Sequence, residues 1–136
     1  MSSPPDMSPP PSTFMQAAGL VLDKVETSHV TGWIDLGAEH HQPWGLVHGG
    51  VYTTAIESAA SVGASTAAHE HGLLAVGINN NTNFLRSMTE GRVTVDACAI
   101  QQGRTQQLWE VRITDDHERL IATGQVRLQN ITPRLT

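Results

Sequence analysis

Apolar and polar residues alternate along most of the second half of the chain. Apolar side chains recur at every second position within residues 91–102, 106–115 and 119–131. A period of two is typical of β-strands that have one buried and one wetter face. Residues 75–87 and a hairpin over residues 20–37 are further extended segments, although the run Asn-Asn-Asn at 79–81 is poor strand-forming sequence.

A long segment of small residues interrupts the predicted strands. Residues 49–72 contain no proline, lie between glycines and place Ala, Ser or Gly on nearly every face of a helix. Such a helix is buried on most sides by closely packed backbone. A short helix over residues 13–18 precedes the first hairpin and ends at Gly19. This order predicts an α+β fold in which one curled antiparallel sheet wraps around a single long helix.

Length and charge restrict the classes of partner. The chain has 136 residues, the size of one domain, and its 8 Lys+Arg against 13 Asp+Glu give a net charge of −5. This balance argues against a nucleic-acid partner. The sequence has no apolar run of about 18 residues and no charged start followed by an apolar stretch, which argues against membrane insertion and secretion. We therefore expect a cytoplasmic protein with no membrane partner.

The positions of proline, cysteine and histidine give three further predictions. Residues 1–12 hold five of the seven prolines and predict a disordered tail, which leaves residues 13–136 as one domain. The single cysteine, Cys98, excludes an intramolecular disulfide, and we expect it to be a buried free thiol. His40 and His41 are adjacent, which is not the spacing of metal ligands, so no metal site is predicted.

Two residues of the predicted long helix carry the candidate chemistry. Glu57 is the only charged residue between Gly49 and Ala68, and an unpaired buried carboxylate is costly outside an active site. The alternative is a structural glutamate that forms a salt bridge with Arg86 or caps a neighbouring element. Gly49 begins the helix, so its N–H would lack an intrahelical partner and would suit an oxyanion. The alternative is a glycine needed only for the turn.

A motif around these two residues resembles a known family. Residues 44–52 read Trp-Gly-Leu-Val-His-Gly-Gly-Val-Tyr, and Ile-Glu-Ser follows at 56–58. The combination resembles the hotdog-fold acyl-CoA thioesterases, in the branch of the phenylacetate-pathway and Arthrobacter-type 4-hydroxybenzoyl-CoA enzymes. The likeness extends from about residue 20 to residue 131. It implies a hotdog fold, homodimers that pair into homotetramers, active sites at the dimer interface, and hydrolysis of a thioester.

The resemblance implies roles for five residues. The Gly49 N–H would polarise the thioester carbonyl, and Glu57 would act as the nucleophile or as the general base that activates water. Ser61, one helical turn after Glu57, would position the carboxylate or the water. Gln42 would border the carbonyl from the preceding loop, and the His48 ring would help to place the thioester.

The substrate contacts are expected at five further positions. CoA is an anionic nucleotide, which guanidinium groups bind well. The candidate contacts are Gly50, Asn81, Arg86, Arg104 and Thr105. No cofactor is expected, because CoA is part of the substrate.

Two other functions remain open at this point. The same fold serves acyl-CoA hydratases and dehydratases, which usually pair an aspartate with a histidine, and it could also bind acyl-CoA without catalysis. For a thioesterase, the residues leave the acyl group open between aryl and short- or medium-chain classes.

Overall fold

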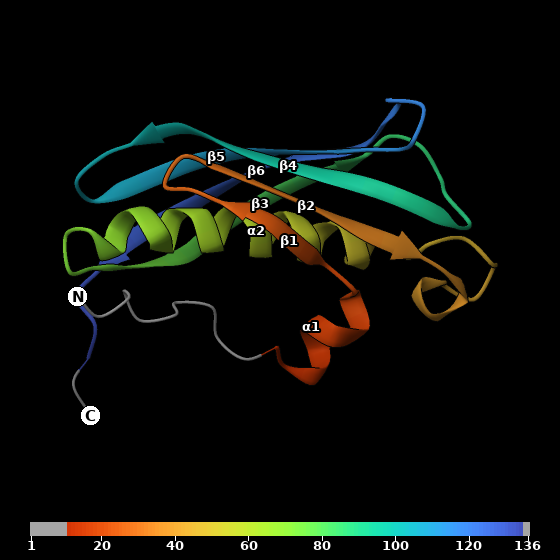
Figure 1. Cartoon of the computed structure of the whole chain (residues 1–136), viewed down its shortest axis with the longest axis horizontal. Coiled ribbons are helices and arrows are strands. Elements are labelled where there is room, and N and C mark those ends of the chain that lie inside the picture. Colours follow the sequence, from red (N-terminus) through yellow and green to blue (C-terminus); the bar gives the residue numbers. More distant parts are fainter. Residues whose placement is uncertain (1–10, 135–136) are drawn as a thin grey trace.

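The structure is a computed structural model that describes residues 11–134. These residues form a β-sheet that packs against one long helix (Figure 1). The predicted disordered tail falls almost entirely outside this part of the chain. The elements are, in order, α1 (Thr13–Ala18), β1 (Val21–Val25), β2 (His29–Leu36), a 3-10 turn (Ala38–His40), α2 (Gly49–His69), β3 (Leu74–Phe84), β4 (Gly91–Gln102), β5 (Gln106–Thr114) and β6 (Leu120–Ile131). Each predicted element is present.

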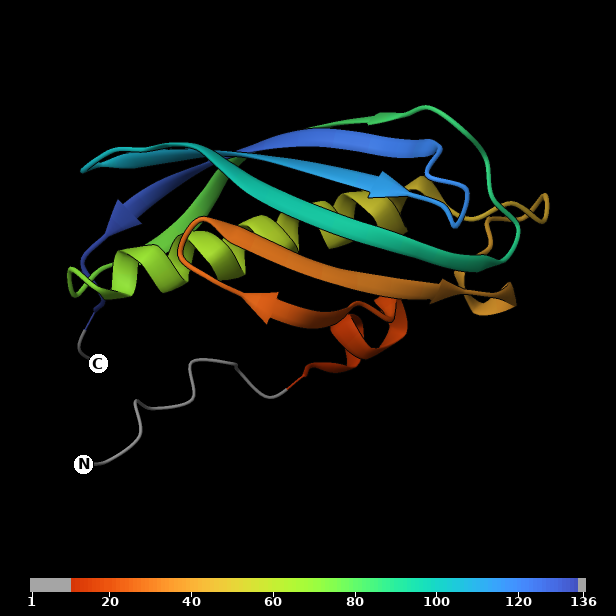
Figure 2. The same cartoon turned by 45° about the horizontal axis from the view of Figure 1, so that its top comes forward.

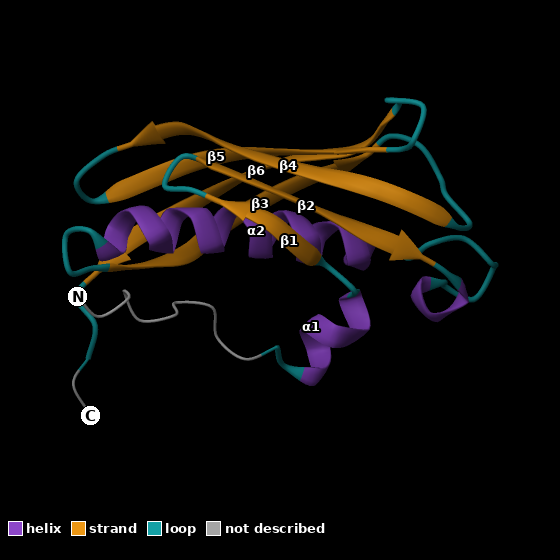
Figure 3. Cartoon of the chain, in the orientation of Figure 1, coloured by secondary structure: helices purple, strands orange, loops and turns teal. Residues whose placement is uncertain are grey.

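All strands of the described chain join one antiparallel sheet of order β1-β2-β4-β5-β6-β3. The sheet twists and curls over α2, which runs along its concave face (Figures 2 and 3). Strands β1 and β3 form the two edges. Strand β3 pairs with β6, the last strand along the sequence. This edge of the sheet therefore depends on the pairing of two strands that are far apart in the sequence.

The core lies between the sheet and α2. The inward positions of the alternating strands meet the alanine-rich face of the helix, which lets the two backbones approach closely. This explains why small residues predominate in α2. The fully buried core side chains include Val30, Ile34, Ala55, Ile56, Ala59, Ala60, Ala64, Val93, Val95, Trp109, Val111, Ile113, Val126 and Leu128.

The short helix α1 lies on the side of α2 that faces away from the sheet (Figure 1). Ser12 caps it by accepting a hydrogen bond from the Met15 N–H (3.1 Å), and Gly19 ends it in a left-handed conformation with φ of 78°. Helix α1 is held in place by the His40 ring, whose Nε2 bonds the Ala17 carbonyl (3.0 Å). Among residues 11–134, no helix combines the length and the apolar character that crossing a lipid bilayer requires.

Gly63 of α2 is expected to tolerate no side chain. A Cβ atom there would meet the Trp109 ring and Val30. The ring cannot swing away, because the Trp109 Nε1–H donates to Gln107 (2.9 Å) and Gln107 in turn donates to the Ala64 carbonyl (2.9 Å).

Gly63→Ala should therefore lower the free energy of unfolding. Overpacking costs about 1–3 kcal/mol, whereas the gain in helix propensity is only about 1 kcal/mol. The difference in the free energy of unfolding is measured by urea denaturation, with circular dichroism as the signal. Ser61→Ala is the control on the same helix, because Ser61 is only partly buried and its hydroxyl makes no hydrogen bond within residues 11–134. An unfolding midpoint for Gly63→Ala at or above that of the wild type would contradict the packing argument.

Candidate active site

The N-terminus of α2 presents one backbone donor without a partner. His48 is the N-cap, and its Nδ1 accepts the Gly50 N–H (2.8 Å). The Val51 N–H donates to the His48 carbonyl (3.0 Å), and the His48 N–H donates to the His40 carbonyl (2.8 Å). Within residues 11–134, the Gly49 N–H has no hydrogen-bond partner. The positive end of the helix dipole stands behind this free donor.

A groove of about 780 Å³ lies in front of the Gly49 amide. A Cβ at Gly49 would come within 2.9 Å of the exposed Phe84 ring of β3, which would have to shift to make room for it. Arg86 is the one lysine or arginine among the residues that line this groove. The residues that line the groove are Gln42, Leu46, Val47, His48, Gly49, Gly50, Tyr52, Phe84, Leu85, Arg86 and Ser87.

Gln42 and His48 line this groove, and one polar atom of each side chain already accepts a backbone hydrogen bond. The Gln42 Oε1 accepts the Trp44 N–H (2.6 Å), which fixes the side-chain amide and leaves its Nε2 free to donate. Because the His48 Nδ1 accepts a backbone N–H, the proton of the neutral ring lies on Nε2. Both side chains therefore keep a free N–H in the groove that Gly49 also lines, and N–H donors are the groups that stabilise a developing oxyanion.

Tyr52 is a residue of this groove that sequence reasoning missed. Its side chain is buried, and its hydroxyl has no hydrogen-bond partner among the described residues. The ring packs against Phe84, with centroids 6.4 Å apart. Burial raises the pKa of the Tyr52 phenol to about 12, so it remains neutral at physiological pH. No sequence pattern distinguishes it from an ordinary aromatic core residue.

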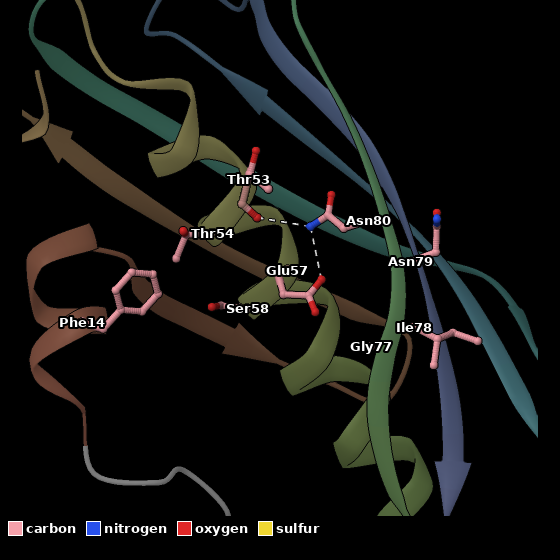
Figure 4. A pocket seen from close by; sticks show the side chains of 9 residues that line it. All are labelled: Phe14, Thr53, Thr54, Glu57, Ser58, Gly77, Ile78, Asn79 and Asn80. Carbon is pink, nitrogen blue, oxygen red and sulfur yellow. Dashed lines mark hydrogen bonds between the residues drawn. The ribbon is translucent and has the colours of Figure 1, made fainter. Parts of the chain in front are cut away.

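Glu57 lines a second groove, of about 450 Å³, between α1, α2 and β3 (Figure 4). Phe14 of α1 lies on one side of this groove, and Asn80 of β3 lies on the other with its side chain pointing toward Glu57. The carboxylate is partly buried and accepts a hydrogen bond from the Asn80 Nδ2 at Oε2 (3.2 Å). No salt bridge joins Glu57 to Arg86 within residues 11–134, so this form of the structural alternative does not hold.

The other predicted positions are distributed unevenly around these grooves. Ser61 is partly buried one turn after Glu57, and its hydroxyl has no hydrogen-bond partner within the described chain. Gly50 lies in the wall of the Gly49 groove with its N–H held by His48. Arg104 and Thr105 are exposed in the β4–β5 turn, which adjoins the C-terminal half of α2 through the Gln107–Ala64 hydrogen bond. One chain therefore does not bring these two residues to Gly49.

Asn81 lies on the outer face of the sheet rather than beside Glu57. Simple alternation from Ala75 places Asn79, Asn81 and Asn83 on the helix-facing side. A β-bulge between Gly77 and Asn79 shifts the register, so Asn81 pairs with Gln125 on the outside. The side chain that reaches Glu57 is that of Asn80, which simple alternation places on the outer face of the sheet.

Cys98 is exposed on the outer face of β4, which corrects the expectation of a buried thiol. The alternation that buries Val95 and Ala97 turns Cys98 outward. Partial desolvation and then the neighbouring Asp96 carboxylate raise the pKa of the thiol. The ligand atoms of His29, Asp96 and Cys98 lie within 4.8 Å of one another. However, His29 is already bonded to Asp96 (2.6 Å) and to Lys24 (3.0 Å), whose charge disfavours a cation.

Comparison with known proteins identifies the family. Residues 45–122 match the Thioesterase superfamily. This range includes α2, which contributes residues to both grooves. The chain belongs to this superfamily. It is 43% identical to the Mycobacterium tuberculosis protein Rv1847 over 123 residues, which is 89% of this chain and 88% of the relative. The solved structure of Rv1847 superposes with a TM-score of 0.86 and covers 91% of this chain and 100% of that chain.

Two further relatives of this thioesterase have informative names. A 1,4-dihydroxy-2-naphthoyl-CoA hydrolase of Listeria monocytogenes is 36% identical over 112 residues, covering 82% of this chain and 90% of the relative. The proofreading thioesterase EntH of Klebsiella pneumoniae is 28% identical over 112 residues, covering 82% and 81%. The chain is thus a thioester hydrolase with a hotdog fold, and these names favour hydrolysis over the hydratase and non-catalytic alternatives.

Proposed function

We propose that this thioesterase hydrolyses acyl-CoA to the free acid and CoA. The observation that carries the proposal is the Gly49 N–H at the start of α2, which has no partner within residues 11–134 and lies in a groove that Gln42 and His48 also line. A thioester carbonyl placed there becomes an oxyanion when its carbon is attacked, and preorganised donors lower that barrier. Arg86 supplies positive charge for the CoA phosphates in an otherwise acidic chain.

Glu57 supplies the attacking group in this proposal. It either attacks the carbonyl carbon directly, so that CoA leaves as the thiol and water cleaves the resulting anhydride, or it takes a proton from the water that attacks. Both routes consume one water and release acid and thiol. Phe14 gives the Glu57 groove an apolar wall beside polar Thr and Asn side chains, which suits an aryl or a short- to medium-chain acyl group.

The test is thiol release from a panel of acyl-CoA substrates. The panel includes benzoyl-, phenylacetyl- and 1,4-dihydroxy-2-naphthoyl-CoA and straight chains of graded length, and released CoA is measured with a thiol reagent. We expect the highest kcat/KM for one aryl or short- to medium-chain member. Saturable binding without release across the whole panel would overturn the proposal.

A complete site requires two copies of the chain. Gly49 and Glu57 are eight residues apart on α2, about 12 Å along its axis, whereas attack needs the reacting atoms about 3–3.5 Å apart. They also line separate grooves. We propose that Gly49 of one protomer works with Glu57 of its partner across antiparallel α2 helices. The partner's β4–β5 turn, with Arg104 and Thr105, then lies at the same end as Gly49.

The β3 edge offers the surface for this homodimer. Its unpaired strand edge carries exposed Val76, Ile78 and Phe84, which water would otherwise cover at a cost. Pairing of two β3 edges brings two α2 helices together beneath a continuous sheet. A further pairing of such dimers into a homotetramer is part of the same proposal.

Mixing two inactive variants tests the shared site. Glu57→Gln and Gly49→Pro each disable one half of the site, and a mixed dimer then contains one site with both defects and one site with neither. Random exchange of protomers should therefore restore about one quarter of the wild-type activity. The variants are unfolded and refolded together, and thiol release is measured. If each site came from a single chain, the mixture would remain inactive.

A further inference from the structure

The asparagine run of β3 has an unexpected relation to Glu57. Asparagine is disfavoured in β-strands, yet Asn79, Asn80 and Asn81 occupy the middle of the edge strand β3. Gly77 pairs with Leu128 and Asn79 with Arg127, so Ile78 is the extra residue of a bulge. After the bulge, Asn80 pairs with buried Val126, and its side chain faces α2. The bulge thus brings one asparagine amide to the helix.

The orientation of the Asn80 amide is fixed by three hydrogen bonds. Its Nδ2 donates to Glu57 Oε2 (3.2 Å) and to the Thr53 carbonyl (3.3 Å) (Figure 4). Its Oδ1 accepts the Thr82 hydroxyl (2.7 Å). The carbonyl and the carboxylate can only accept, so the NH₂ group must point toward them. Asn80 consequently presents a donor, rather than an acceptor, to the Glu57 carboxylate.

The second oxygen of Glu57 is confined by Gly77. A Cβ atom at position 77 would overlap Glu57 Oε1. The carboxylate therefore lies against bare backbone on one side and against the Asn80 amide on the other. A glutamate side chain has several rotatable bonds, and these two contacts with β3 reduce its freedom to a narrow range of positions.

We propose that Asn80 is a positioning residue for Glu57, with Gly77 providing the space in which the carboxylate is held. This inference rests on the proposed function, in which Glu57 is the attacking group. Asn80 keeps Oε2 engaged and aims the carboxylate into the groove. Asn80 makes no contact with the substrate in this proposal and acts through Glu57.

Asn80→Asp is the decisive variant, because it keeps the shape of the side chain and replaces the donor by a second carboxylate. Two carboxylates within hydrogen-bond distance do not ionise at the same pH. The acidic limb of the kcat/KM profile should therefore move to higher pH by about one unit or more. At pH 7, kcat should fall about 10- to 100-fold, with KM changed about twofold or less.

Asn80→Leu and Asn83→Asp complete the experiment. Asn80→Leu removes the donor without adding charge, so it should lower kcat without the full displacement of the acidic limb. Asn83→Asp makes the same change of charge on the same strand but on its outer face, and it should leave kcat and the profile unchanged. Circular dichroism over the same pH range shows whether each variant stays folded.

The outcomes separate this inference from the proposed function. If Glu57→Gln abolishes thiol release but Asn80→Asp keeps the wild-type pH profile, Asn80 does not position Glu57. An equal displacement in Asn83→Asp would also overturn the inference, since it would then be a general effect of charge. If Glu57→Gln retains full activity, the proposed role of Glu57 fails first.

Discussion

Glu57→Gln is expected to lower kcat for acyl-CoA hydrolysis by about 10²- to 10⁴-fold. Glutamine has nearly the same shape, and its amide oxygen can still accept the hydrogen bond from Asn80. The substitution therefore removes the nucleophile or base and leaves the packing between α2 and β3 intact. Thiol release measures the loss, and thermal unfolding checks that the fold is retained.

Glu70→Gln is the matched control for Glu57→Gln. Glu70 is the C-cap residue of the same helix and is exposed to solvent, so the control makes an identical change of charge outside both grooves. Its activity should equal that of the wild type. More than about one tenth of the wild-type kcat in Glu57→Gln would show that Glu57 does not perform the chemical step.

Gly49→Pro is expected to lower kcat by about 10²- to 10³-fold, the usual cost of losing one oxyanion donor. Proline deletes the backbone N–H, and the first position of a helix is the one that accepts it. His48 has φ of −65° and ψ of 131°, which is the conformation that a residue before proline prefers. The substitution can therefore remove the donor without breaking α2.

Gly49→Ala separates the donor from the space around it. Both variants push against the Phe84 ring, which is 56% exposed and free to move, but only alanine keeps the N–H. Alanine should retain much more of the wild-type kcat than proline. Equal losses in the two variants would assign the effect to the Phe84 contact and would contradict the oxyanion role.

Local sequence patterns predicted the elements of this fold well. Period-two alternation marked β4, β5 and β6, and glycines at both ends marked α2. The position of Gly49 at the start of α2 also followed from the sequence, because a helix N-terminus leaves its first N–H groups without partners. These features depend on neighbouring residues only, and the sequence contains all of them.

Features that depend on distant contacts were not predictable. The bulge at Ile78 arises from the pairing of β3 with β6, and it reversed the expected faces of Asn80 and Asn81. The separation of Gly49 and Glu57 into two grooves depends on how α1 and β3 pack against α2. Nothing in a residue pattern of one chain reports such packing. The expectation of an active site at a dimer interface came from the family resemblance alone, and it stays a proposal.

The bulge in β3 also bears on how related chains can diverge. Ile78 has no partner on β6, and the residues on either side of it form the pairs Gly77–Leu128 and Asn79–Arg127. Deleting Ile78 would leave these pairs in place, and Asn80 would still pair with Val126 and face α2. A bulge of this kind therefore lets an edge strand gain or lose one residue without turning the residues beyond it to the other face of the sheet.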